Sequence, residues 1–199
     1  EVPEGYEKFV KDLKMMHELA GILRKEKENR GYIDFKVDEA KILVDEACVP
    51  YEVTLRNRGT GERLIEDFMI AANECVATHI YFMNLPFIYR IHEQPKEERI
   101  RDFLSFIGTL GYKANGNLKE NTPKNIQKLI KMLEDKKEFK ILSNLLLRSM
   151  QKAEYRETNL GHFGLASKCY THFTSPIRRY PDTTVHRLLR TYLFNKQMD

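Results

Sequence analysis

The sequence predicts an α+β fold that is mostly helical and contains a few short strands. Apolar residues recur at helical spacing in several long segments, whereas β-branched and aromatic residues gather in runs of only four to six residues. Hydrophobic residues make up 42% of the 199 positions and charged residues 31%, which is typical of a globular protein with one sizeable core. We therefore expect residues 1–199 to form one unit.

The helices are expected, in chain order, at residues 6–30, 62–81, 95–110, from Thr122-Pro123 onward, and at 138–151. The first carries an apolar stripe, and Gly31 is a typical helix terminator. The second has acids such as Glu66 near its start, where the positive end of the helix dipole favours negative charge. A Thr-Pro pair is a typical helix start, because the hydroxyl caps N–H groups and proline needs no hydrogen bond there.

The strands are expected to be short. Residues 32–37, 41–44, 51–55 and 87–91 are rich in β-branched and aromatic side chains. The first three runs suggest a small sheet edge rather than a complete sheet. From residue 152 to residue 161 the chain loses its periodicity, and no element is predicted there.

Cysteine usage and hydropathy favour a cytoplasmic protein that does not bind membranes. The three cysteines are odd in number and widely spaced, without the pairing typical of metal ligands, so we expect reduced thiols. No apolar run is long enough to span a bilayer, and no signal peptide opens the chain.

The excess positive charge of the chain lies in one segment. Residues 168–190 hold five Lys or Arg against one acid, a net charge of +4, which equals the net charge of the whole chain. Several histidines and aromatic residues stand beside these cations. A neutral body with one compact basic and aromatic segment favours a binding site for a polyanion.

Inside this segment, Ser175-Pro176 is a helix-start signal. The hydroxyls of Thr174 and Ser175, free backbone N–H groups and Arg178 one turn later would then form a phosphate cradle. Arginine suits this role because its planar fork can bind two phosphate oxygens at once. The alternative is a helix with a solvated charged face. Pro181 is expected to start a second helix.

Residues 162–189 (HFGLASKCYTHFTSPIRRYPDTTVHRLL) resemble the signature at the end of the catalytic domain of the ribonuclease R and ribonuclease II (RNB) family. Further matches, in the family's order, are residues 30–35 (RGYIDF), 64–73 (LIEDFMIAAN) and 90–95 (RIHEQP). The form with His172 and Phe173 before the Thr-Ser-Pro, and Arg-Arg-Tyr-Pro-Asp after it, is more similar to ribonuclease R. The resemblance covers essentially the whole chain.

This resemblance implies the C-terminal half of an RNB-type catalytic domain. The parent protein would be a processive, Mg2+-dependent exoribonuclease that degrades single-stranded RNA from its 3′ end and releases nucleoside 5′-monophosphates. The family's metal-binding aspartates lie upstream of the segment that matches Glu1, and its flanking cold-shock and S1 modules are not visible here. We therefore expect no metal site in this chain, since two Mg2+ ions need several clustered carboxylates.

The expected partners are single-stranded RNA and the remainder of the same catalytic domain, in a protein that is otherwise a monomer. The fragment alone is expected to be inactive. Two alternatives of other classes stay open at this point: a non-catalytic RNA-binding module, and a helical scaffold whose arginines bind a protein partner.

The resemblance also implies roles for individual residues. Arg178 would clamp the scissile or adjacent phosphate, Glu66 would reach the ribose of the last nucleotide, and Phe35 would stack on its base. A carboxylate that accepts a hydrogen bond from a 2′-OH distinguishes RNA from DNA. The residues alone allow simpler interpretations, with Glu66 as a surface acid near a helix start and Phe35 as a buried strand residue.

Two further positions have open alternatives. Arg179 would hold a phosphate further along the RNA, or it would form an internal salt bridge with Asp182. His162 would approach RNA, or it would brace its own loop. Thr174 and Ser175 complete the expected RNA contacts through the phosphate cradle.

Overall fold

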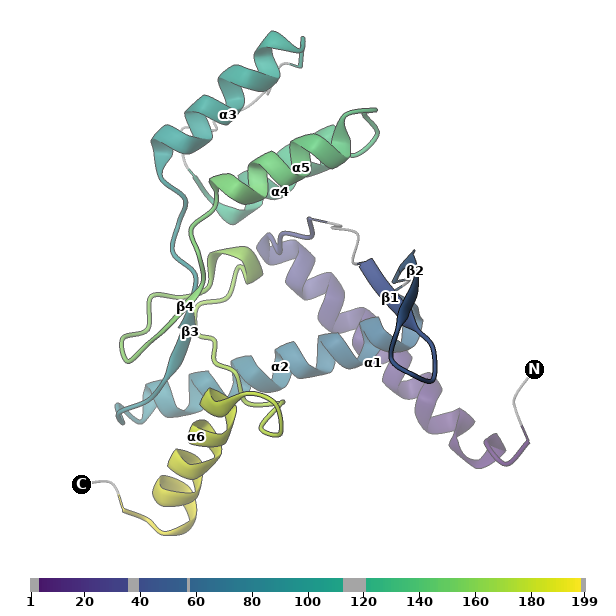
Figure 1. Cartoon of the computed structure of the whole chain (residues 1–199). Coiled ribbons are helices and arrows are strands. Elements are labelled where there is room, and N and C mark those ends of the chain that lie inside the picture. The colour runs from purple at the N-terminus through teal and green to yellow at the C-terminus, as the bar shows by residue number, and fades with distance from the viewer. Residues whose placement is uncertain (1–3, 36–39, 57, 113–120, 198–199) are drawn as a thin grey trace.

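The computed structural model describes residues 4–35, 40–56, 58–112 and 121–197. Helices dominate these residues (Figure 1), which confirms the predicted, mostly helical α+β fold: α1 (Val10–Arg30), α2 (Thr60–Phe82), α3 (Glu97–Thr109), α4 (Pro123–Leu133), α5 (Phe139–Ser149) and α6 (Tyr180–Leu189). Three short helical turns are η1 (Glu7–Phe9), η2 (Phe163–Leu165) and η3 (Arg190–Phe194). The ends of the predicted helices differ from the observed ends by only a few residues.

The strands form two separate antiparallel pairs. β1 (Ala40–Val44) pairs with β2 (Pro50–Leu55), and β3 (Tyr89–Ile91) pairs with β4 (Glu154–Arg156). β1, β2 and β3 confirm three of the predicted strands. β4 was not predicted, because three residues in an aperiodic segment carry no pattern and become a strand only by pairing with β3.

The strand predicted at residues 32–37 is wrong over its described part, because residues 32–35 have no regular structure. The backbone of these residues forms hydrogen bonds with groups that do not belong to a neighbouring strand. The N–H of Ile33 donates to the carbonyl of Gly164 at 3.0 Å, and the Ser143 hydroxyl donates to the carbonyl of Phe35 at 2.8 Å. Residues 36 and 37 lie outside the described residues.

The buried apolar side chains form two clusters. One joins α3, α4 and α5 and includes Ile33 and Phe163 from connecting segments. The other joins the C-terminal half of α2 to β3, α6 and η3, with Ile80, Ile91 and Val185 fully buried. Figure 1 shows this division, with α3, α4 and α5 on one side of the β3–β4 pair and α2 and α6 on the other. The basic segment thus belongs to the second cluster.

The three cysteines are free thiols. Cys48 and Cys75 are exposed, whereas Cys169 is buried in the second cluster. Burial raises the pKa of the Cys169 thiol to about 11, which makes it unreactive at neutral pH. None of the described helices combines the length and the apolar character that crossing a bilayer requires.

Gly31 ends α1, as predicted, and brings α1 close to the start of α4. Its backbone is left-handed, with φ of 107°, a conformation that favours glycine. A Cβ atom at this position would lie 2.7 Å from the backbone nitrogen of Lys124. Only glycine therefore allows this close approach of two backbones.

We expect Gly31→Ala to lower the free energy of unfolding by about 2 kcal/mol or more, because the added methyl strains the backbone and clashes with α4. Gly21→Ala is the matched control, since Gly21 lies inside α1 with open space around its Cα. That control should raise stability by about 0.5–1 kcal/mol, the difference in helix propensity. Urea unfolding of the purified variants measures both effects, and equal stability of the two variants would contradict this account.

Candidate functional site

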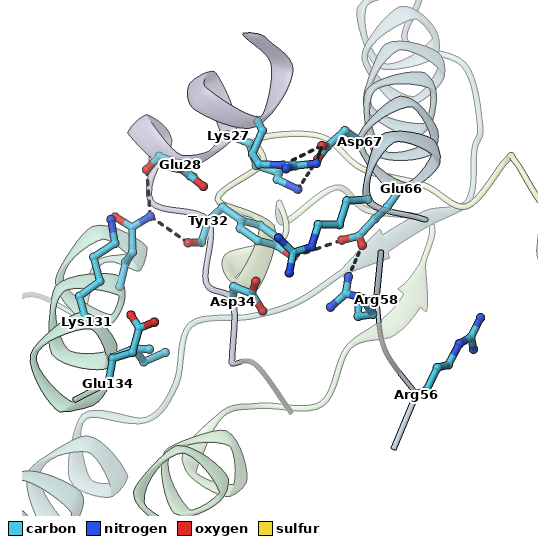
Figure 2. A pocket seen from close by; sticks show the side chains of 14 residues that line it. Lys27, Glu28, Tyr32, Asp34, Arg56, Arg58, Glu66, Asp67, Lys131 and Glu134 are labelled. Carbon is cyan, nitrogen blue, oxygen red and sulfur yellow. Dashed lines mark hydrogen bonds and ion pairs between the residues drawn. The ribbon is translucent and has the colours of Figure 1, made fainter. Parts of the chain in front are cut away.

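A polar hollow of about 740 Å³ lies where α1, α2 and α4 approach one another (Figure 2). Its lining comes from the end of α1, from Tyr32 and Asp34 after it, from Arg56 and Arg58 after β2, and from the start of α2. Glu66 and Asp67 of α2 both line this hollow. The hollow therefore contains Glu66, the carboxylate for which the sequence analysis expected a role.

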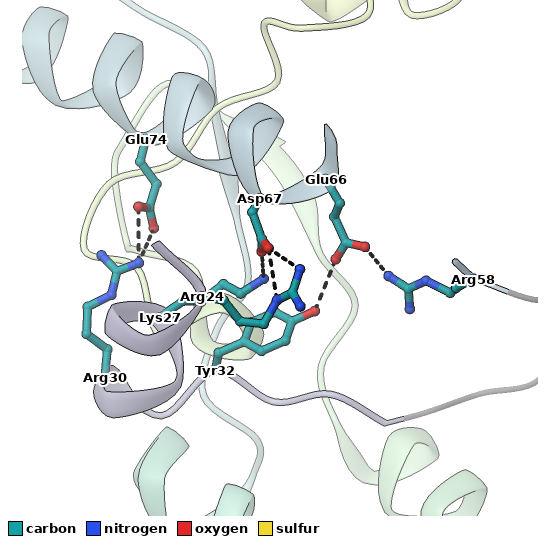
Figure 3. A network of polar contacts seen from close by, with 8 residues as sticks. All are labelled: Arg24, Lys27, Arg30, Tyr32, Arg58, Glu66, Asp67 and Glu74. Atoms are coloured by element: carbon teal, nitrogen blue, oxygen red, sulfur yellow. Dashed lines mark hydrogen bonds and ion pairs between the residues drawn. The ribbon is translucent and has the colours of Figure 1, made fainter. Parts of the chain in front are cut away.

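Glu66 is held from two sides. One carboxylate oxygen accepts a long hydrogen bond of 3.5 Å from the Tyr32 hydroxyl, and the other accepts from the guanidinium of Arg58 (Figure 3). Burial raises the pKa of Tyr32 above its ordinary value, and the nearby Glu66 and Asp34 raise it further. Tyr32 thus stays a neutral donor, and the Glu66 carboxylate is fixed toward the hollow.

Asp67, the next residue, points to other partners. Its carboxylate accepts from Lys27 at 2.8 Å and from Arg24 at 2.9 Å (Figure 3). Asp67 and Lys27 are both buried, and the Lys27 ammonium also lies 4.0 Å from the centre of the Tyr32 ring. This buried ion pair joins α2 to α1 and so positions the hollow.

The described residues do not fit a magnesium site. They contain no group of three or more His, Cys, Asp or Glu side chains placed to hold a metal ion. Two acids of the hollow are bound to cations: Glu66 to Arg58, and Asp67 to Lys27 and Arg24. Asp38 and Glu39, another acidic pair of the sequence, lie outside the described residues.

The helix predicted to start at Ser175-Pro176, on which the expected phosphate cradle was based, is not formed. The chain makes a single turn over residues 176–178, and α6 begins only at Tyr180, where Pro181 stands in the first turn as predicted. The backbone N–H groups of Thr174 and Ser175 are not free. They donate to Oδ1 of Asn73 at 3.2 Å and to Oδ1 of Asp182 at 2.7 Å. Two buried side chains thus take the donors that were expected to bind an anion.

The two neighbouring arginines of this turn differ in their surroundings. Arg179 donates to Asp182 at 2.8 Å, and Asp182 is fully buried, so the structure contains the internal salt bridge that was one of the two alternatives for Arg179. Arg178 is exposed, and its side chain has no hydrogen bond or ion pair with any described residue. Its guanidinium is therefore available to a ligand.

His162 braces its loop. Its Nδ1 accepts from the N–H of Leu165 at 3.2 Å, and its ring lies 5.1 Å from that of His92 and 5.2 Å from that of Tyr170. Burial, together with the neighbouring His92 and Arg90, lowers the pKa of His162 to about 3. The imidazole is therefore neutral at physiological pH, and a contact with RNA stays a prediction.

Phe35 is half-buried and packs against the cluster of α3, α4 and α5. The residue before it, Asp34, lines the hollow. Part of the Phe35 ring, however, packs against the apolar core. Its stacking on a base stays a prediction. The hydroxyl of Thr174 is buried and has no partner among the described residues, and Ser175 is half-buried.

The sequence interpretation missed Tyr32 and Arg58, which hold the Glu66 carboxylate. Asp182 was expected only as a salt-bridge partner of Arg179, and the hydrogen bonds of Asn73 and Asp182 to the backbone around the Arg178 turn were not predicted. Asn73 carried one usable signal, since it is a polar residue seven positions after Glu66 and therefore lies on the same side of α2. Arg58 carried none, because an arginine after a strand has no special pattern.

Residues 3–195 match the RNB domain family. The chain is 51% identical over 187 residues to ribonuclease R 1 of Lactococcus lactis subsp. lactis, which covers 94% of this chain and 23% of the relative. Mycoplasma genitalium RNase R in complex with ribose-methylated single-stranded RNA has a similar fold, with a TM-score of 0.90, 34% identity, and 96% of this chain and 30% of that chain covered. The same protein in complex with double-stranded RNA gives a TM-score of 0.89, 34% identity, and coverages of 94% and 33%. This chain thus spans only about a quarter to a third of the length of these relatives.

We expect Asp67→Ala to lower the free energy of unfolding by about 3–5 kcal/mol, because it leaves the buried Lys27 ammonium without its counter-charge. Glu74→Ala is the matched control, because Glu74 pairs with Arg30 between the same two helices while 45% of the Arg30 side chain is exposed. The control should cost about 1 kcal/mol or less. Urea unfolding measures both variants, and equal losses would contradict the importance of burial.

Stability should fall with acid because His162 is neutral in the fold. The unfolded chain takes up the proton near pH 6.5, whereas the folded His162 resists it until about pH 3, so its contribution is present above pH 6.5 and is lost as pH falls. Between pH 6.5 and 4.5 His162→Asn should lose about 2 kcal/mol less stability than the unmodified chain. His17→Asn, at an exposed position of α1, should follow the unmodified chain. Parallel curves for all three proteins would contradict this assignment.

Proposed function

The chain belongs to the RNB domain family, and from this premise we propose that it is part of a processive 3′-to-5′ exoribonuclease. The parent protein hydrolyses single-stranded RNA to nucleoside 5′-monophosphates. The observation that carries the proposal is the similarity to ribonuclease R over nearly the whole chain, at 34% to 51% identity. The complexes of the Mycoplasma protein with RNA support RNA as the substrate.

Arg178 is the phosphate-binding residue in this proposal. Its guanidinium is exposed and unpaired among the described residues, and it stands on a turn that buried side chains hold in place. A fixed cation next to the scissile or adjacent phosphate stabilises the charge that develops on the phosphoryl oxygens. Its neighbour Arg179 acts only through the turn, because it is bound to Asp182.

Glu66 is the sugar-reading residue. The long 3.5 Å contact with Tyr32 leaves this carboxylate oxygen weakly bound, so a 2′-OH donor can replace or supplement the tyrosine. Because deoxyribose has no such donor, the contact favours RNA over DNA. Phe35 follows Asp34, a lining residue of the hollow, and its ring is half-buried. In this proposal the exposed part of the ring stacks on the terminal base.

The remainder of the catalytic domain is the partner that this chain needs. Large apolar side chains are exposed on α1 and on both strands of the β1–β2 pair, including Leu13, Ile22, Tyr51 and Val53. A two-stranded pair is marginal by itself, and such surfaces are typically covered by other parts of a protein. We place the carboxylates that bind Mg2+ in that remainder, and the isolated chain should have weak or no nuclease activity.

A non-catalytic RNA-binding module is the second candidate. It is favoured by one observation, which is that the described residues contain no cluster of carboxylates suited to metal ions. Chelation separates the two candidates in the full-length protein. Nucleotide release that stops with EDTA supports the nuclease, whereas RNA binding without release in Mg2+ supports the module.

We expect Arg178→Lys in the full-length protein to reduce turnover of single-stranded RNA by about a hundredfold or more, while RNA binding weakens only slightly. The reason is that lysine keeps the charge but loses the planar fork that fits the transition state. Arg148→Lys, at an exposed position of α5 outside the basic segment, is the matched control and should leave both quantities unchanged. Steady-state kinetics and filter binding measure the two quantities. Equal turnover of Arg178→Lys and the unmodified protein would rule out this role.

A further inference from the structure

We propose that Asn73 is a positioning residue that fixes the turn carrying Arg178 against the helix carrying Glu66. The inference rests on the proposed function, because it concerns the same site. It adds that the geometry between the phosphate-binding and sugar-reading residues is set by one buried amide rather than by either of those residues.

Asn73 uses its whole side chain on the basic segment. Its Nδ2 donates to the Tyr170 hydroxyl at 3.0 Å, and its Oδ1 accepts from the backbone N–H groups of Phe173 at 2.9 Å and Thr174 at 3.2 Å. Asn73 is only 2% exposed. A backbone N–H that is shielded from water needs an acceptor. Without Asn73, the N–H groups of Phe173 and Thr174 would each have to find another one.

Asn73 also shares a face of α2 with Glu66. The two residues are seven positions apart, which is about two helical turns, so their side chains leave the helix in similar directions. An α-helix is rigid over this length. A contact that fixes the basic segment to Asn73 therefore fixes it relative to Glu66 as well.

Asp182 holds the same segment from the other end. Its Oδ1 accepts from the N–H of Ser175 at 2.7 Å and from Arg179 at 2.8 Å. The carbonyl of Ser175 in turn accepts from the N–H groups of Arg178 and Arg179. The backbone from residue 173 to residue 179 is thus held by Asn73 and Asp182, and Arg178 stands at the only exposed arginine position of the turn.

A positioning residue differs from a structural one in what its loss changes. Removal of the Asn73 acceptor leaves two part-buried N–H groups unpaired, so residues 173 and 174 must move toward a new partner. A shift of about 1 Å in a catalytic group can cost about a hundredfold in rate. The effect should therefore appear in kcat through Arg178, and it should disappear when Arg178 is already impaired.

The test uses the full-length protein with single-stranded RNA. Asn73→Leu, which removes the acceptor, should lower kcat at least about tenfold while KM changes by less than about threefold. Asn73→Asp keeps the acceptor and leaves an oxygen to accept from Tyr170, so it should retain most of the activity. Asn121→Leu is the matched control, because Asn121 is also a buried asparagine but contacts Pro95 and Gln94 instead. It should lower thermal stability without changing kcat.

A double-mutant cycle with Arg178→Lys measures whether the two residues act together. In that background Asn73→Leu should cost less than about twofold, because the contact it disturbs is already impaired. A similar loss in both backgrounds would overturn the proposal, and so would equal losses for Asn73→Leu and Asn73→Asp. If Arg178→Lys is too inactive to measure, the comparison of the Leu and Asp variants decides.

Two outcomes separate this proposal from the function on which it rests. If Arg178→Lys is fully active, the proposed function fails. If Arg178→Lys is impaired but a folded Asn73→Leu is fully active, only the positioning role fails. Should Asn73→Leu not fold, Asn73→Ala removes the same acceptor without adding bulk, and the same criteria apply to it.

Discussion

A polar side chain that is buried in a protein must find its partners inside, and helix α2 meets this constraint at two positions that organise the rest of the site. Asp67 is paired with Lys27 and Arg24 and thereby joins α2 to α1. Asn73 holds the basic segment through three hydrogen bonds. Glu66 directly precedes Asp67 on this helix and lines the polar hollow. The direction of this one carboxylate therefore depends on contacts made by its neighbours on the same helix.

The use of these internal partners changes how an anion can be recognised. A helix start with free N–H groups would bind phosphate through the backbone, with little need for any one side chain. Here the N–H groups of Thr174 and Ser175 are bound to Asn73 and Asp182, so the proposed function assigns phosphate binding to the exposed guanidinium of Arg178. The salt bridge of Arg179 to Asp182 stiffens the turn beside Arg178, whose side chain has no partner among the described residues.

Parts of the surface of this chain are rich in large apolar side chains, as protein interiors are. The β1–β2 pair exposes apolar residues on both strands, and α1 exposes several more, while the chain spans about a quarter to a third of the relatives' length. Glu66 and Asp67, two acids of the hollow, are paired with basic residues, and the described residues contain no group of acids placed to hold a metal ion. The exposed apolar surface supports the proposed function, which assigns RNA contacts to this part and the hydrolytic chemistry to the rest of the catalytic domain.

The sequence by itself determined the helices, the strands β1 to β3 and the helix end at Gly31, because periodicity and turn residues are local properties of the chain. It did not determine β4, the irregular course of residues 32–35 or the single turn at Pro176. Only the tertiary structure decided these, as it decided whether Arg179 faces RNA or Asp182. The physical reason is that each depends on a partner far away in the chain: the bond between Asn73 and Thr174 joins residues 101 positions apart, and no local pattern encodes it.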